Sequence, residues 1–228
     1  MRSIIFGILT LFAIIDVKAQ DLDSLILYET TEQFLKKLPS CTNATAEIIR
    51  SNPNSMELYK FRDTNTKKKI KRAKQTWGIH FKGNDYFNML YFDDIYIENT
   101  FYKLDIVGRY CVIIIDEDEK YFKSDINYGV GLTNVLISEV EKHKNKGYIW
   151  SDKSGKKYCI ILIDTIEKGN RTLDKNEGSS GSRITKKQLY KKLNINKETI
   201  SFEKFELMNL EEILKLIDQF NIDHEYKH

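Results

Sequence analysis

The segments RYCVIIID (Arg109–Asp116) and KYCIILID (Lys157–Asp164) decide the fold class. Each is a continuous aliphatic run of strand length that ends at an Asp. Such runs are typical of strands that are buried on both faces. The two octets match at an offset of 48 residues. This match is compatible with an internal duplication, but buried strands draw on few residue types, which favours convergence. We therefore expect two central, fully buried strands.

Upstream of the first run, the pattern predicts shorter strands with turns between them. Thr31–Leu38 predicts a helix, with Pro39 just beyond its end. Ser55–Phe61 alternates apolar and polar residues, and the two flanks of Lys82–Asp85 predict a hairpin of 77–81 with 86–90. Residues 91–98 and 101–107 continue with the same period of two. We expect an antiparallel meander over residues 55–116.

Downstream, helices dominate. The spacing of apolar residues in 133–144 favours a helix, although its Val and Ile residues also suit a strand. The polar segment GNRTLDKNEGSSGS predicts a flexible surface loop at about 169–182. Thr185–Gln188 and Asn209–Glu212 have capping-box spacing, and each predicts the start of a helix. The second of these helices places an apolar stripe on one side, formed by Leu210, Ile213, Leu214, Ile217 and Phe220.

Together these patterns predict the class α+β. We expect a single domain over residues 20–228, in which an antiparallel-rich β-sheet carries short helices packed on one face and the C-terminal helices come last. The apolar stripe of the last helix must cover an apolar surface, for which the sheet is the expected partner.

Residues 1–19 indicate export. Met1 and Arg2 precede a 12-residue apolar stretch, Ile4–Ile15, and Val17-Lys18-Ala19 is a small-residue cleavage signature. The apolar stretch is shorter than the ~20 residues that span a bilayer, which disfavours an uncleaved anchor. We expect a signal peptide cleaved after Ala19 and a mature protein that is periplasmic or secreted.

The three cysteines allow at most one internal disulfide. Cys111 and Cys159 lie in the two aliphatic runs, so we expect both to behave as small buried hydrophobic residues. Cys41 lies in a polar stretch and is the expected exposed thiol. The pairing of the three thiols is left open.

Four stretches carry a resemblance to a known family: YETTEQFLKKLPS (28–40), WGIHFKGNDYFN (77–88), FYKLDIVGRYCVIIID (101–116) and ITKKQLYKKL (184–193). In this order they resemble secreted proteins of unknown function from Gram-negative bacteria, which combine a Trp-Gly hairpin with a Gly-Arg-Tyr strand. The resemblance covers most of residues 28–193. It implies the order of elements and export, and it implies no activity, cofactor or catalytic residue.

The tail His224-Glu225-Tyr226-Lys227-His228 contains the string H-E-x-x-H. On a helix this spacing places two imidazoles one turn apart to bind zinc, with Glu225 as the general base. The string stands at the end of the chain given, with no third ligand after it, and chain ends fray. A zinc-dependent hydrolase that uses His224, Glu225 and His228 is therefore kept as the alternative, and a solvated tail is preferred.

Charged clusters offer further binding hypotheses. Lys67–Lys74 (KKKIKRAK) holds six cationic groups that could attract phosphates or anionic lipid headgroups, but a solvated turn is the simpler interpretation. Acidic groups at Asp116–Glu119 and Asp93–Asp94, and the segment 174–178, lack the ligand spacing of a calcium loop. Aromatic residues concentrate in Tyr86–Tyr102 and are expected in the core, with an exposed subset for a glycan or partner left open.

We find neither a nucleophile motif nor a phosphate-binding Gly loop in the sequence. The net charge of +3 gives no polyanion-binding balance, and we expect no nucleic-acid partner and no cofactor. The expected function is that of an exported, non-catalytic binding or cell-envelope accessory protein. Its partner is an unknown protein or envelope component, contact with a membrane surface is compatible with the sequence, and the oligomeric state is left open.

Overall fold

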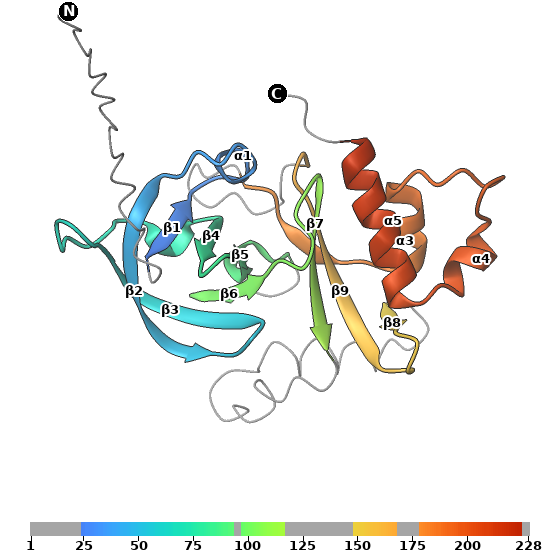
Figure 1. Cartoon of the computed structure of the whole chain (residues 1–228), viewed down its shortest axis with the longest axis horizontal. Coiled ribbons are helices and arrows are strands. Elements are labelled where there is room, and N and C mark those ends of the chain that lie inside the picture. The colour runs from blue at the N-terminus through green and yellow to red at the C-terminus, as the bar shows by residue number, and fades with distance from the viewer. Residues whose placement is uncertain (1–23, 94–96, 117–147, 168–177, 225–228) are drawn as a thin grey trace, which may run out of the picture.

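The computed structural model describes residues 24–93, 97–116, 148–167 and 178–224 (Figure 1). The strands are β1 (Leu25–Tyr28), β2 (Cys41–Ser51), β3 (Ser55–Asp63), β4 (Gly78–Phe81), β5 (Asn84–Asn88), β6 (Thr100–Lys103), β7 (Tyr110–Asp116), β8 (Ile149–Ser151), β9 (Lys157–Asp164) and β10 (Gly181–Arg183). The helices are α1 (Thr31–Leu35), α3 (Lys186–Lys192), α4 (Phe202–Glu206) and α5 (Leu210–Asp223), with 3₁₀ turns η1 (Ala73–Gln75) and η2 (Met89–Tyr91).

Six strands close into an antiparallel barrel in the order β1-β2-β3-β6-β5-β4, with β4 pairing back to β1. Its interior is filled by apolar side chains such as Leu58, Ile79 and Phe101, which are fully buried. The mixture of helices and antiparallel strands that the sequence predicts is confirmed. The meander over 55–116 and the single sheet with helices on one face are wrong, because β3 pairs with β6 and the chain then leaves the barrel for a second sheet.

The second sheet contains β10, β9 and β7, with β8 also paired to β9. Side chains alternate between its two faces, and both faces are buried. Cys111, Ile113 and Ile161 pack with barrel residues, whereas Val112 and Ile160 pack with the C-terminal helices. This burial on both faces explains the aliphatic runs and confirms that both strands are buried. The predicted central position holds for β9 but is wrong for β7, which is the edge strand of this sheet.

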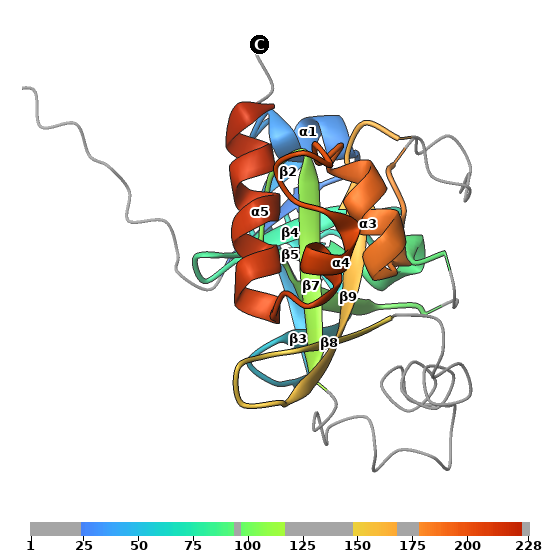
Figure 2. The ribbon, with the colours of Figure 1, turned by 90° about the vertical axis from the view of Figure 1, so that its right-hand side faces the viewer.

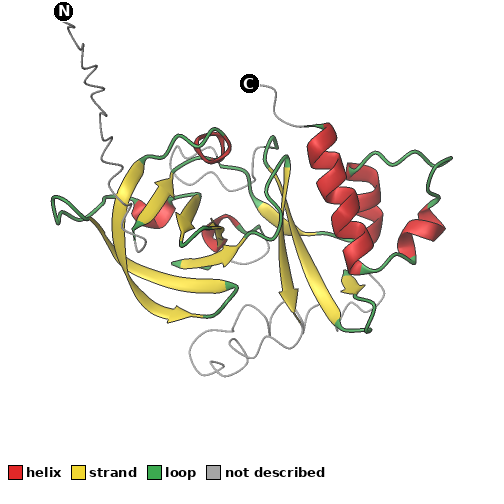
Figure 3. Cartoon of the chain, viewed as in Figure 1, coloured by secondary structure: helices red, strands yellow, loops and turns green. Residues whose placement is uncertain are grey.

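The C-terminal helices form the third layer, in front of β7 and β9 in Figure 2. Figure 3 shows the same order of barrel, sheet and helices by secondary structure. Both predicted capping boxes are present: Thr185 exchanges hydrogen bonds with Gln188, and Asn209 with Glu212. The apolar stripe of α5 contacts the sheet through the buried Ile213 and Ile217. Within the part of the chain that the structure describes, no helix is long and apolar enough to cross a membrane.

The outer edge of β7 is covered by side chains and a loop. Asn221 of α5 accepts a hydrogen bond from Tyr110 N–H (2.8 Å) and donates one to Tyr110 O (2.9 Å). Val112 N–H donates to Ile106 O (3.0 Å), and Ile114 N–H donates to an Asp105 carboxylate oxygen (2.7 Å). Three successive outward N–H groups of one strand are thus satisfied without a neighbouring strand.

Several local predictions need correction. β1 and β2 were not predicted, and residues 89–91 of the aromatic stretch form the 3₁₀ turn η2 instead of continuing as strand. Residues 178–182 were assigned to a surface loop, but Gly178, Ser179 and Gly181 are buried and β10 begins at Gly181. Gly178 is required there because a Cβ would lie 2.6 Å from a ring carbon of Trp77. The remainder of that loop, the helix over 133–144 and the signal peptide lie outside the described residues.

The cysteines behave as the sequence predicts. Cys111 and Cys159 are buried, and Cys41 is partly exposed. β7 and β9 are antiparallel, so Cys111 pairs with Ile163 and Cys159 with Ile115 at separate positions of the ladder. None of the three cysteines forms a disulfide. Burial raises the pKa of the Cys111 thiol to about 12.

Candidate functional site

The basic run follows β3 in a turn that projects at the left of Figure 1. Asp63 holds this turn, because its Oδ1 accepts hydrogen bonds from the backbone of Asn65 (3.0 Å) and Thr66 (2.7 Å). The backbone hydrogen bond from Thr66 is the main reason why the pKa of Asp63 lies below its usual value. The chain then folds back along β3, and Lys69 pairs with Arg62 in a β-bridge. The lysines after the turn are therefore placed beside the basic residues of the strand.

A β-bulge supplies a further cation from within β3. The register pairs Thr45 with Arg62 and Glu47 with Tyr59, so β3 has one more intervening residue than β2. Lys60 lies in this bulge with φ +52°, a left-handed conformation that residues other than Gly, Asn and Asp rarely adopt. Bulges re-aim side chains at barrel rims, and strained residues gather at functional sites. The Lys60 ammonium lies 2.6 Å from Glu47.

The third contribution comes from η1. Arg72 precedes it with φ +62°, and Ala73 packs into the barrel core. The side-chain amide of Asn88 donates to the carbonyls of Lys74 (2.9 Å) and Thr76 (2.6 Å), which fixes the backbone of this turn. The Lys74 ammonium lies 5.5 Å from the centre of the Tyr59 ring, within reach of a cation–π interaction.

These three segments enclose a groove of about 290 Å³, which we call the basic groove. Its cationic side chains are Lys60, Lys69, Arg72 and Lys74, and its apolar floor includes Phe61 and Ile70. The volume is close to the lower end of the roughly 300–1,000 Å³ of typical small-ligand pockets. The groove can therefore hold a group of the size of a phosphate together with part of the molecule that carries it.

Charge is strongly segregated around the basic groove. Residues 60–74 contain eight basic residues and one acidic residue, so this segment carries +7. The whole chain carries +3, and the rest of the chain must therefore carry −4. All eight basic residues are exposed. Among the residues that the structure describes, only Lys60 of the eight is in an ion pair. The acidic groups that balance the total charge thus leave this surface positive.

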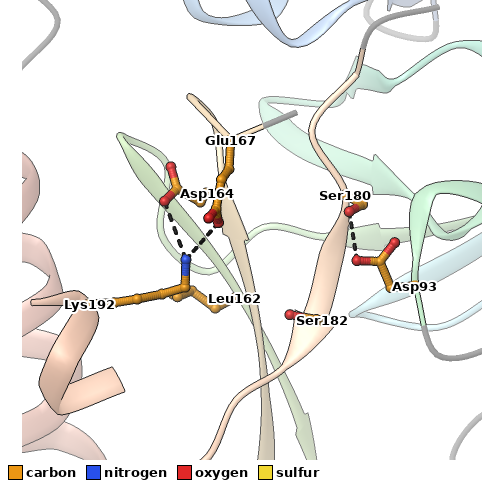
Figure 4. Close-up of a pocket in the computed structure, with 7 residues that line it drawn as sticks. All are labelled: Asp93, Leu162, Asp164, Glu167, Ser180, Ser182 and Lys192. Carbon is orange, nitrogen blue, oxygen red and sulfur yellow. Dashed lines mark hydrogen bonds and ion pairs between the residues drawn. The ribbon is translucent and has the colours of Figure 1, made fainter. Parts of the chain in front are cut away.

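A second cavity of about 230 Å³, the polar cleft, lies between β9, β10 and the end of α3 (Figure 4). On one wall, the Lys192 ammonium lies 2.7 Å from Glu167 and 3.5 Å from Asp164. On the other wall, the Ser180 hydroxyl donates to Asp93 (2.7 Å). The Asp93 backbone N–H donates to Gly181 O (2.9 Å), which ties the barrel side of the cleft to β10.

The charged side chains of the polar cleft largely satisfy one another. Burial alone would lower the pKa of Lys192, but the hydrogen bond and charge of Glu167, with Asp164, outweigh burial and raise it. Asp164 is also 3.7 Å from the guanidinium of Arg109. Such a network is typical of ion pairs that hold layers together. It offers a ligand fewer open charges than the basic groove does.

The structure describes one residue of the H-E-x-x-H string. The ring of His224 stacks on Phe220 at 4.0 Å, and its Nδ1 lies 2.9 Å from Phe220 O. Because a carbonyl oxygen can only accept, Nδ1 carries the hydrogen in this arrangement. Glu225–His228 lie outside the described residues, so the zinc site remains an untested alternative. The described residues contain no group of three or more His, Cys, Asp or Glu side chains that could hold a metal ion.

The other predicted sites also lie partly within and partly outside the described residues. Of the acidic clusters, Asp93 lies in the polar cleft and Asp116 pairs with Lys156, while Asp94, 117–119 and 174–177 lie outside the described residues. The described aromatic residues of the Tyr86–Tyr102 stretch are buried, in agreement with a core role.

Sequence reasoning identified Lys67–Lys74 and missed Lys60 and the polar cleft. Lys60 gave no signal because its role depends on a bulge that no local pattern shows.

Comparison with protein-family models, curated proteins and solved structures gives no match for this chain.

Proposed function

We propose that this chain is an exported, non-catalytic accessory protein of the cell envelope that binds phosphate-bearing anions through the basic groove. The observation that carries this proposal is the set of exposed cations around a cavity, formed by the segment 60–74 whose formal charge is +7. The resemblance to secreted proteins and the features of residues 1–19 support the envelope location. We further propose that the protein has no cofactor.

The physical argument rests on unpaired charge. A lysine or arginine already held by a carboxylate gains little from an anion, whereas a solvated cation in a shaped groove gains a second partner. Lys69, Arg72 and Lys74 are exposed, and among the described residues none of them is in an ion pair with a carboxylate. Two of the groove's four cations, Lys60 and Arg72, have positive φ. A backbone held in this rare conformation favours a functional role for their placement.

Binding of single-stranded nucleic acid is disfavoured by the same geometry. Such sites stack bases on exposed aromatic rings. Trp77, the Trp that follows the basic run, is fully buried, and its indole N–H donates to Ser179 O (2.8 Å). The groove therefore lacks the Trp platform that the sequence could have provided.

The test is a titration of the protein with pyrophosphate, in which calorimetry measures the affinity at several salt concentrations. The triple variant Lys69→Gln/Arg72→Gln/Lys74→Gln should bind at least ~10-fold more weakly than the unchanged protein, because it lacks three of the groove's four cations. The affinity of the unchanged protein should fall as the salt concentration rises, because salt screens ion pairing. The matched control is Lys187→Gln/Lys191→Gln/Lys215→Gln, which removes the same charge from exposed helix positions. Absence of binding by the unchanged protein, or an equal loss in the control, would overturn the proposal.

A further inference from the structure

An apolar feature lies beside the basic groove. Ile48 and Ile49 of β2 are consecutive residues, yet they are 45% and 50% exposed. In a regular barrel strand one of two consecutive side chains faces the interior. The register pairs Ile48 with Leu58 and Arg50 with Glu57, so Ile49 is the extra residue of a second bulge. Of the described residues, these two are the only consecutive pair of large, exposed apolar side chains.

The isoleucine pair lies close to the groove along β2. Ile48 follows Glu47, whose carboxylate holds the Lys60 ammonium at 2.6 Å. Glu47 also pairs across the ladder with Tyr59, over which the Lys74 ammonium lies. A rise of about 3.3 Å per residue places the isoleucines within a few residues' length of the groove's cations. Two exposed apolar side chains thus lie near a dense positive charge.

Resting on the proposed function, we propose that the partner of this surface is the anionic phospholipid surface of a membrane. The cations of the basic groove contact lipid phosphates, and Ile48 and Ile49 insert at the boundary of headgroups and acyl chains. Buried apolar area and attraction to anionic lipids are the two terms that determine interfacial binding. The apolar floor of the groove, with Phe61 and Ile70, suits the same boundary.

Other occupants use only part of this surface. A second copy of the chain would bring two segments 60–74, each with a formal charge of +7, close together, and their repulsion opposes such a dimer. A soluble polyanion would contact the cations and leave Ile48 and Ile49 in water. An anionic bilayer is the partner that matches both the charge and the exposed apolar pair.

The experiment is co-sedimentation of residues 20–228, the expected mature chain without the apolar stretch 4–15, with vesicles of phosphatidylcholine, with or without about one-third phosphatidylglycerol. Three variants are compared with the unchanged protein: Ile48→Ser/Ile49→Ser, the triple Gln variant of the groove, and a control, Leu207→Ser/Ile222→Ser. The control residues are 86% and 62% exposed and lie in or beside the C-terminal helices. Thermal unfolding checks that each variant is folded.

We expect binding to the anionic vesicles alone. Each groove cation near the membrane contributes on the order of a fivefold change, so the triple Gln variant should lose roughly a hundredfold in partitioning. The Ile48→Ser/Ile49→Ser variant should lose at least ~10-fold on vesicles while it keeps its pyrophosphate affinity. The control should bind the vesicles like the unchanged protein.

The contrary outcomes separate the two proposals. If the isoleucine variant sediments like the unchanged protein, or if the control variant loses as much vesicle binding as the isoleucine variant, then insertion of Ile48 and Ile49 into the membrane is wrong. If pyrophosphate binds but vesicles do not, or if heparin binds and vesicles do not, the membrane proposal is overturned and the anion-binding function stands. If neither pyrophosphate nor vesicles bind, the proposed function itself has failed.

Discussion

The replacement Asn221→Ala tests how α5 is attached to the second sheet. Asn221 is 8% exposed, and its amide makes two hydrogen bonds with Tyr110, of 2.8 and 2.9 Å. Removing the amide leaves both backbone groups of Tyr110 without that partner in a buried place. An unsatisfied buried group costs about 1–3 kcal/mol, and partial access of water favours the low end. We expect the free energy of unfolding to fall by about 2–4 kcal/mol.

Urea unfolding monitored by tryptophan fluorescence measures this change, because Trp77 and Trp150 are both fully buried. In thermal unfolding the same loss corresponds to roughly 5–15 °C for a chain of this size. The control is Gln219→Ala on the same helix, whose exposed side chain bonds only Asp223 among the described residues. That change should stay within ~0.5 kcal/mol of the unchanged protein.

A second substitution shows whether the cost arises from the amide. A Cβ on Gly108 would lie 2.5 Å from Cγ and Nδ2 of Asn221, so Gly108→Ala should displace the amide and break the same hydrogen bonds. The cost of Gly108→Ala and Asn221→Ala together should then be smaller than the sum of the single costs by at least ~1 kcal/mol. Additive costs, or a loss under ~0.5 kcal/mol for Asn221→Ala, would refute this reasoning.

Three further outcomes are expected. In the folded protein Cys41 should react with a thiol reagent while the two strand cysteines stay protected, because burial raises the pKa of Cys111 to about 12 and excludes the reagent; equal labelling without denaturant would contradict this. The backbone hydrogen bond from Thr66 lowers the pKa of Asp63, so this carboxylate contributes stability above its unfolded-state pKa that is lost as pH falls through the lowered folded-state pKa. Asp63→Asn should therefore lose less stability than the unchanged protein in urea unfolding from about pH 5 to 2, and equal losses would count against this hydrogen-bond network. If residues 224–228 form no metal site, zinc and chelator should give the same Tm, with or without residues 225–228; a zinc-dependent gain of several degrees in the full chain alone would support the hydrolase.

The parts of the fold that the sequence predicted correctly are those with a local cause. β7 and β9 each carry an aliphatic run that can be recognised from neighbouring residues alone, and the barrel and the helices bury it from both sides. The capping boxes at Thr185 and Asn209 require only neighbouring residues, and both are formed. The spacing of the apolar stripe of α5 is also a local signal, and its Leu210, Ile213 and Ile217 are buried while Leu214 and Phe220 are partly buried.

Closure of the barrel could not be predicted from local patterns. It depends on the pairing of β1 with β4 and of β3 with β6, which joins segments distant in sequence. β2 gave no alternating signal because two bulges interrupt its register and most of its side chains are exposed.

The candidate site shows the same division between local and distant causes. The string KKKIKRAK predicted positive charge, but the groove exists because Asp63 turns the chain back and a bulge places Lys60 opposite Lys69 and Arg72. The polar cleft joins Asp93, Asp164, Ser180 and Lys192, which are far apart in the sequence, and no spacing rule brings them together.

The covering of the outer edge of β7 has a consequence for how the chain matures. Asn221, which closes the edge at Tyr110, lies in α5, so this position is open until residues 210–223 have been synthesised and docked. An open strand edge is a template for pairing with another chain. A molecule that lacks α5 therefore exposes the backbone of Tyr110 to pairing with another chain, while Val112 and Ile114 remain covered by Ile106 and Asp105. Docking of α5 therefore completes the protection of this edge.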